Sequence, residues 1–119
     1  MNDYLIDYEI RYGILKGMKV SEAFKEKKYK ELYELREYLV KNFSKQEKKI
    51  KEKIVKGIIA IDVRLLKQYS ILLNEFYKKF NSLTKEEKSK IKIENEIFET
   101  NNILGIQDII SQIDNVKTL

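Results

Sequence analysis

The sequence predicts an all-α protein, a helical bundle of about four to six helices built around one long central helix at about residues 45–81. Its composition favours helices joined by short connections, because the chain has no proline, four glycines and abundant Lys, Glu, Ile and Leu. Apolar residues recur at intervals of four, four and three between Ile50 and Phe80, an eleven-residue repeat close to the natural turn of a straight helix. Ser44 and Thr84 are each followed three residues later by Glu, a spacing typical of helix starts.

Residues 3–16 fit two patterns. Tyrosines and isoleucines alternate with other residues, as they do in a strand. If the segment is instead a helix, four residues share one face: Tyr4, Tyr8, Tyr12 and Leu15. We predict a helix because the rest of the chain is so strongly helical. A strand remains the alternative, with residues 91–97 as the other alternating patch. Tyrosines at this spacing are more often core residues than a surface for stacking on bases.

Residues 21–43 form a helical stretch that Ser21 can cap. A polar break at Lys27 and Lys28 would divide it into a short and a longer helix, and one continuous helix is the alternative. The residues that we expect to face inward are Phe24, Leu32, Leu35, Leu39, Val40 and Phe43.

The long helix carries a seam of apolar residues that we predict to form an oligomer interface, most simply in a homodimer: Ile54, Ile58, Ile61, Leu65, Tyr69, Leu72 and Phe76. Other faces of the helix are also apolar, at Val55, Ile59, Val63, Leu66, Ile71 and Leu73. A helix that is apolar nearly all round is typically buried by neighbours on several sides. Charges at Asp62, Arg64 and Lys67 make the stretch unsuitable for a membrane span.

Asp62 is placed among apolar neighbours at helical spacing. If buried, its carboxylate needs a donor from another helix. The candidates are a hydroxyl of Tyr4, Tyr8 or Tyr12, or Arg64 or Lys67 of a second subunit. Such a pair would set the register of the seam. The alternative is that Asp62 reaches solvent.

Beyond the long helix, the motif at Thr84 opens a charged helix that carries Ile91, Ile97 and Phe98. Asn101, Asn102 and Gly105 mark an interruption. A short amphipathic helix with Ile106, Ile109, Ile110 and Ile113 follows, before a frayed tail from about residue 115. With no internal repeat and no low-complexity linker, we expect residues 1–119 to form a single helical domain.

Composition argues against an enzyme. The chain has no histidine and no cysteine, which removes the usual general base near neutral pH and the soft metal ligands. It contains no glycine-rich phosphate-binding loop. We therefore predict no catalytic residues, no metal site and no cofactor. The N-terminal residues lack the pattern of a signal peptide, so we expect a cytoplasmic protein without a membrane partner.

Residues 8–40 resemble the helix-turn-helix DNA-binding unit. An amphipathic segment ends at residues 15–18, Ala23 supplies a small residue in a second helix, and a third helix would run from Tyr29 to Val40. The resemblance implies that this third helix enters the major groove. It also carries Glu31, Glu34 and Glu37, whose carboxylates oppose phosphates. An ordinary helical hairpin is the alternative.

The net charge of +5 comes mostly from lysines of the long helix. A stripe of Lys45, Lys49, Lys53, Lys56, Arg64 and Lys67 lies opposite the isoleucine seam. The residues that we predict to contact nucleic acid are Lys45, Lys48, Lys49, Lys53, Lys56, Lys27, Lys28 and Lys30. Lysine suits phosphates better than base edges, so backbone contacts to DNA or RNA should dominate.

Two functions fit this pattern. The first is a small, non-enzymatic nucleic-acid-binding regulator that oligomerises through the long helix. The alternative is a protein-interaction module, such as an adaptor or a phage- or plasmid-type inhibitor that docks on a larger protein complex. Its contact surface would be the spare apolar faces and the tyrosines.

Overall fold

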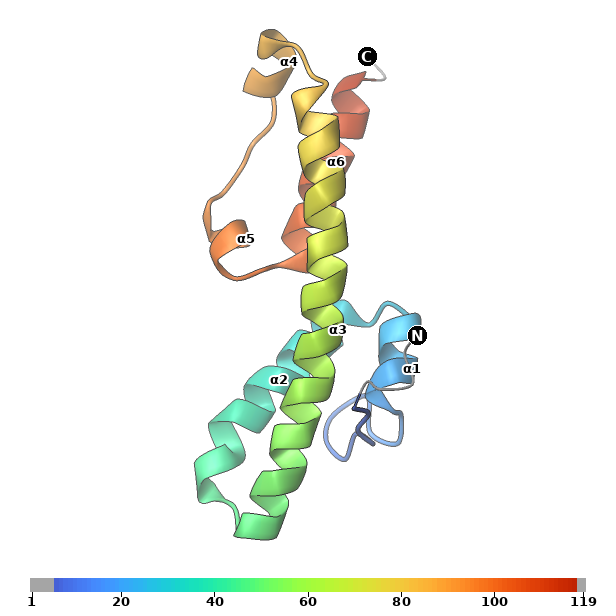
Figure 1. Ribbon diagram of the computed structural model, residues 1–119, viewed down its shortest axis with the longest axis vertical. Helices are drawn as coiled ribbons and strands as arrows, with labels where there is room; N and C mark the ends of the chain where they lie inside the picture. The colour runs from blue at the N-terminus through green and yellow to red at the C-terminus, as the bar shows by residue number, and fades with distance from the viewer. Residues whose placement is uncertain (1–5, 118–119) are drawn as a thin grey trace. The chain divides into compact units, whose positions relative to one another are not determined.

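The computed structural model describes residues 6–117, which form six α-helices and one 3-10 turn, with 72% of these residues helical (Figure 1). No β-strand occurs among them. The longest element is α3 (Lys48–Asn81), a helix of 34 residues. The predicted fold class, an all-α protein with one long helix, is confirmed.

The chain divides into two compact units, and the division falls inside α3. The first unit ends at Leu65 and the second begins at Leu66. Each unit therefore contains one half of the long helix. The assignment of the whole chain to a single domain stays a prediction.

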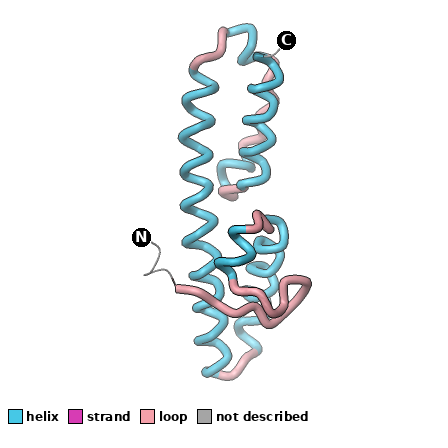
Figure 2. Tube along the Cα trace, turned by 90° about the vertical axis from the view of Figure 1, so that its right-hand side faces the viewer, coloured by secondary structure: helices cyan, strands magenta, loops and turns pink. Residues whose placement is uncertain are grey.

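The first unit is a helical hairpin with an irregular N-terminal segment packed on it. It contains α1 (Val20–Lys25), α2 (Tyr29–Asn42), the 3-10 turn η1 (Phe43–Lys45) and the first half of α3. The tube in Figure 2 and the ribbon in Figure 1 both show α2 running alongside this half of α3. Gly57 allows this close approach, because a Cβ there would lie 3.2 Å from Leu39 and from the ring of Tyr8. The core consists of Tyr8, Ile10, Leu15, Val20, Ala23, Tyr29, Leu32, Leu35, Leu39, Ile54, Ala60, Ile61 and Leu65.

The helix predicted for residues 3–16 is wrong over the described part, which is a loop. Gly13 and Gly17 have φ angles of +77° and +96°, a left-handed conformation that glycine adopts at low cost. The chain folds back on itself, so the Ile10 N–H donates to Met18 O at 2.8 Å and the Gly17 N–H to Ile10 O at 2.9 Å. The strand alternative is wrong as well, because the described part forms no strand; it makes one isolated bridge, from Glu9 to Lys19 and not to residues 91–97. Tyr4 lies outside the described residues.

The predicted break at Lys27 and Lys28 is confirmed, because α1 ends at Lys25 and α2 begins at Tyr29. Lys27 has a φ of +59° there. The helix caps predicted at Ser21 and at Ser44 are wrong. Lys19, rather than Ser21, is the N-cap of α1, and Ser44 lies within η1 while α3 begins four residues later, at Lys48.

The second unit contains the rest of α3, α4 (Lys85–Ser89), α5 (Glu96–Glu99) and α6 (Ile103–Lys117). The capping box at Thr84 is confirmed, since the Glu87 N–H donates to Thr84 Oγ1 at 3.1 Å and the Thr84 N–H donates to Glu87 Oε1 at 2.8 Å. The helix that it opens has five residues, so the predicted continuation to Phe98 is wrong. Beyond α4 the chain runs along α6, where the backbone N–H of Lys92 donates to Oε1 of Gln112 at 2.9 Å.

The isoleucines of α6 fill the core of the second unit. Ile103, Ile106, Ile109, Ile110 and Ile113 are all buried. The predicted interruption lies at Asn101, which has a φ of +51°, whereas Gly105 is inside the helix. The frayed tail predicted from residue 115 is wrong as far as Lys117, which ends α6 and donates to Ser82 Oγ at 2.6 Å. Residues 118–119 lie outside the described residues.

Candidate nucleic-acid interface

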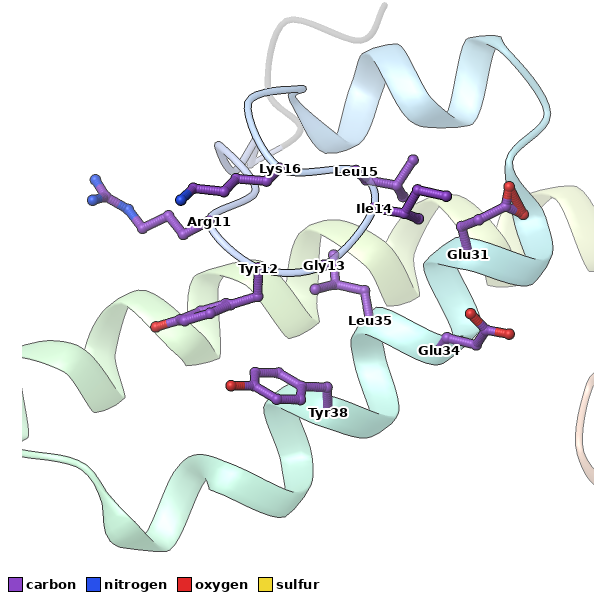
Figure 3. Close-up of a pocket in the computed structure, with 10 residues that line it drawn as sticks. All are labelled: Arg11, Tyr12, Gly13, Ile14, Leu15, Lys16, Glu31, Glu34, Leu35 and Tyr38. Atoms are coloured by element: carbon purple, nitrogen blue, oxygen red, sulfur yellow. The ribbon is translucent and has the colours of Figure 1, made fainter.

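A groove of about 420 Å³ opens between the loop at residues 11–16 and helix α2 (Figure 3). Its walls include two tyrosines, Tyr12 from the loop and Tyr38 from α2, whose ring centroids lie 5.2 Å apart. Leu15 and Leu35 contribute apolar surface. The remaining lining residues are Arg11, Gly13, Ile14, Lys16, Glu31 and Glu34.

The groove has charges of opposite sign at its two ends. Arg11 and Lys16 lie at one end, and Glu31 and Glu34 lie at the other (Figure 3). Within residues 6–117, none of these four side chains has an ion-pair partner. Their charges are therefore available to a ligand.

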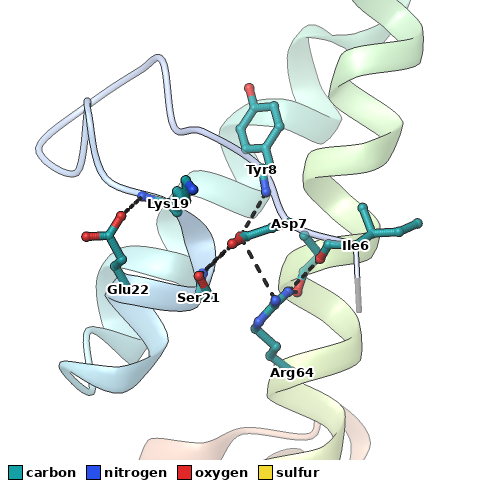
Figure 4. Close-up of polar contacts among 8 residues, drawn as sticks. Ile6, Asp7, Tyr8, Lys19, Ser21, Glu22 and Arg64 are labelled. Atoms are coloured by element: carbon teal, nitrogen blue, oxygen red, sulfur yellow. Dashed lines mark hydrogen bonds and ion pairs between the residues drawn. The ribbon is translucent and has the colours of Figure 1, made fainter. Parts of the chain in front are cut away.

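Asp7 and Arg64 hold the N-terminal segment on the helices (Figure 4). Asp7 accepts hydrogen bonds from the Ser21 hydroxyl at 2.6 Å, from the Ser21 N–H at 3.1 Å and from the Tyr8 N–H at 2.9 Å. Arg64 Nη1 donates to the carbonyls of Ile6 and Ala60 at 2.8 and 2.9 Å. These bonds tie the segment to α1 and to α3, and so they position the loop that forms the groove.

The same contacts set the ionisation of Asp7. Burial raises the pKa of this carboxyl, but the hydrogen bonds from Ser21 and Tyr8 and the charge of Arg64 lower it by more. The net pKa is therefore below its ordinary value. Asp7 remains a carboxylate across the neutral range.

Three of the predicted lysines lie on one face of α3. Lys49, Lys53 and Lys56 are exposed and recur at helical spacing. A second hollow, of about 180 Å³, brings Arg11 to Lys53 and Lys56; Asp7, Tyr8 and Glu9 complete its lining. Arg11 also lines the groove, so it lies beside both hollows.

The other predicted lysines line neither hollow. Lys45 and Lys48 are exposed around the start of α3, whereas Lys27 and Lys28 lie in the connection before α2 and Lys30 is its second residue. The fourteen residues of α2 separate the two groups by about 20 Å. Arg64 does not belong to the exposed stripe, because only 8% of it is accessible and its guanidinium binds backbone carbonyls.

The helix-turn-helix resemblance lacks its first helix. Residues 8–16 form a loop, and α1 has only six residues. The face of α2 with Glu31, Glu34 and Tyr38 lines the groove beside this loop. The expected recognition helix therefore presents carboxylates beside the loop, and these oppose the phosphates of a major groove.

The seam predicted as an oligomer interface is packed inside the two units. Ile54, Ile61 and Leu65 are buried in the first, Tyr69, Leu72 and Phe76 are buried in the second, and Ile58 is half-buried. The large apolar side chains of α3 that stay exposed in the first unit are Val55, Ile59 and Val63, each 39–40% accessible.

Asp62 is paired within the chain. Its two oxygens accept from Arg36 of α2, through Nε and, at 3.1 Å, through Nη2. The predicted donors, which were tyrosines or a cation of a second subunit, are wrong. The bond also raises the pKa of Arg36. Val40 is one turn beyond Arg36, and Ile59 is one turn before Asp62, so Val40 and Ile59 flank the pair on one side of the hairpin.

Comparison with family models, curated proteins and solved structures finds no match to this chain. Within residues 6–117, no helix has the length and apolar character needed to cross a membrane. The same residues contain no group of three or more carboxylates placed to hold a metal ion. The sequence did not point to Arg11, Lys16 or Tyr38, because their neighbours in the groove are distant along the chain.

Proposed function

We propose that this protein is a small, non-enzymatic, cytoplasmic regulator that binds nucleic acid through its phosphates. The contact surface consists of Lys49, Lys53, Lys56 and Arg11, which we call the cationic face. The observation that carries the proposal is that these four cations are exposed, that Arg11 lies with Lys53 and Lys56 around one hollow, and that none has an ion-pair partner among the described residues.

Unpaired lysines on an ordered helix suit phosphate binding. Each is a flexible point charge that releases a counterion when it meets a phosphate. The nearby Asp7 carboxylate is already engaged by Ser21, Tyr8 and Arg64, which reduces its repulsion of phosphates. The affinity should depend steeply on salt and weakly on base sequence.

The test compares two triple variants of equal charge. In the first, Lys49, Lys53 and Lys56 are replaced by Gln; in the second, Lys27, Lys28 and Lys30 are replaced. Fluorescence anisotropy against duplex and single-stranded DNA and RNA gives affinity at several salt concentrations. The first variant should reduce the slope of log K against log salt by up to about 0.9 per lost contact on duplex DNA.

The second variant is the control, because its lysines lie around the N-terminal end of α2, whereas the lysines of the cationic face lie on α3. It should keep the parent slope. Equal losses in both variants would mean that net charge alone governs binding, and an unchanged slope in the first would remove the cationic face from the interaction.

A protein-interaction module is the second candidate, favoured by the exposed apolar residues of the hairpin. Val55, Ile59 and Val63 follow one another on α3 at intervals of four, and Val40 flanks them from α2. Such a surface suits a second copy of the chain or a larger protein complex. If no nucleic acid binds even at low salt, this second function replaces the first.

A further inference from the structure

The groove and the cationic face meet at Arg11, which lines both hollows. We propose that the groove receives bases of single-stranded DNA or RNA, which contact the rings of Tyr12 and Tyr38, while Arg11, Lys16 and the cationic face hold the adjoining phosphates. The inference rests on the proposed function and names its substrate as single-stranded nucleic acid.

The two tyrosines have the placement that stacking requires. Tyr38 is 46% accessible and Tyr12 is half-buried, so neither ring is fully buried in the core. Figure 3 shows both rings at the cationic end of the groove, with their hydroxyls pointing away from the glutamates. The volume of about 420 Å³ lies in the usual range of ligand-binding clefts.

The charges determine which end of the groove the phosphate backbone occupies and which end the bases occupy. Glu31 and Glu34 repel phosphates and exclude the backbone from their end. Arg11 and Lys16 attract it at the other end. Bases would then point from the cationic end towards the carboxylates, which can accept hydrogen bonds from their amino groups.

A duplex cannot use this site. Its bases are stacked on one another and present only their edges, whereas an unpaired strand can turn its base faces towards aromatic rings. A combination of a cationic track with accessible aromatic side chains is typical of proteins that bind single strands. A duplex would contact only the cationic face.

The experiment measures anisotropy of labelled 15-mers, namely oligo(dA), oligo(A) and a DNA duplex, with Tyr12→Leu and Tyr38→Leu. Each variant should lose roughly 5- to 150-fold in affinity for the single strands, the range expected for one stacked base. Duplex affinity and the salt slope should not change, because no phosphate contact is removed. Comparison of oligo(dA) with oligo(A) separates DNA from RNA as the better ligand.

Tyr77→Leu is the matched control, since Tyr77 is 54% accessible and belongs to the second unit. Its affinity should equal that of the parent. Tyr38→Phe keeps the ring and should retain single-strand binding. Circular dichroism and thermal unfolding show whether each variant is folded.

A second measurement keeps the proposal testable if a leucine variant does not fold. The chain has no tryptophan, so its intrinsic fluorescence comes from tyrosine, and unlabelled oligo(dA) should quench it more than the duplex does at saturation. Equal quenching would overturn the inference, as would leucine variants that bind single strands like the parent. If the lysine variant still loses affinity in that case, phosphate binding stands without stacking. If the parent binds no nucleic acid, the proposed function fails and the inference fails with it.

Discussion

Asp7 joins three parts of the first unit that are distant in sequence. It receives hydrogen bonds from Ser21 at the start of α1 and lies 4.0 Å from Nη2 of Arg64 on α3. Arg64 in turn donates to the carbonyl of Ile6. These side-chain contacts add to the backbone hydrogen bonds of the irregular segment in fixing its position on the helices.

The lowered pKa of Asp7 predicts a pH dependence of stability. A carboxyl whose folded pKa lies below its unfolded value stabilises the fold above the unfolded pKa, which is about 3.9, and this contribution disappears as the pH falls through the folded pKa. The free energy of unfolding should therefore fall on acidification below about pH 4. Asp7→Asn should be less stable than the parent at pH 7, and its stability should fall less steeply in acid.

Urea unfolding between pH 7 and pH 2.5 measures this difference. Glu9→Gln is the control, because Glu9 is an exposed carboxylate of the same segment. An Asp7→Asn variant with the stability and pH profile of the parent would show that the network does not support the fold.

Helix α6 depends on one glycine for its packing. A Cβ added at Gly105 would lie 2.7 Å from Cγ1 and 2.9 Å from Cγ2 of Ile97. Neither atom is at the end of a flexible chain, so the neighbour cannot move aside cheaply. The glycine that sequence analysis assigned to an interruption is instead a site of close approach between α6 and the segment around α5.

Gly105→Ala should therefore lower the free energy of unfolding by about 1 kcal/mol. Overpacking costs about 1–3 kcal/mol, and the better helix propensity of alanine returns about 1 kcal/mol. In an Ile97→Ala background the clash is absent, and the same substitution should be neutral or stabilising. Chemical unfolding of the four proteins of this cycle measures the coupling. An identical effect in both backgrounds would contradict the proposed clash.

At the scale of the whole molecule, α3 carries two apolar surfaces, of which one is buried and the other is accessible to solvent. The seam that begins at Ile54 is packed against the chain's own residues. In the first unit Val55, Ile59 and Val63 remain accessible on another face. If the protein self-associates, the accessible residues are the ones free to meet a second copy.

We therefore predict a dimer that depends on the accessible residues. Replacing Val55, Ile59 and Val63 by Ser should weaken association and leave the helical content unchanged. Leu65→Asp should instead unfold the protein, because an unpaired buried charge costs several kcal/mol. Light scattering at tens of micromolar and circular dichroism measure the two effects. A parent protein that is monomeric at these concentrations would exclude the dimer.

The local signals in the sequence predicted the fold class, the long helix, the break between α1 and α2, and the capping box at Thr84. Each of these depends on residues within a few positions of one another: the helical period of the seam, the polar residues at 27–28, and the pair Thr84 and Glu87. The exposed lysines of the candidate site were also named from the sequence, because a charged stripe opposite an apolar one is a local pattern.

Tertiary structure decided the rest. Alternation in residues 6–16 did not reveal that Gly13 and Gly17 would turn the chain back, or that Asp7 and Arg64 would anchor it. The groove combines Arg11 and Tyr12 with Tyr38, which lies 26 residues beyond its partner ring. Arg36, the partner of Asp62, was likewise hidden by its distance along the chain. A pattern read along a sequence reports on neighbours within a few residues, whereas burial, ion pairing and cavity shape depend on contacts between segments far apart.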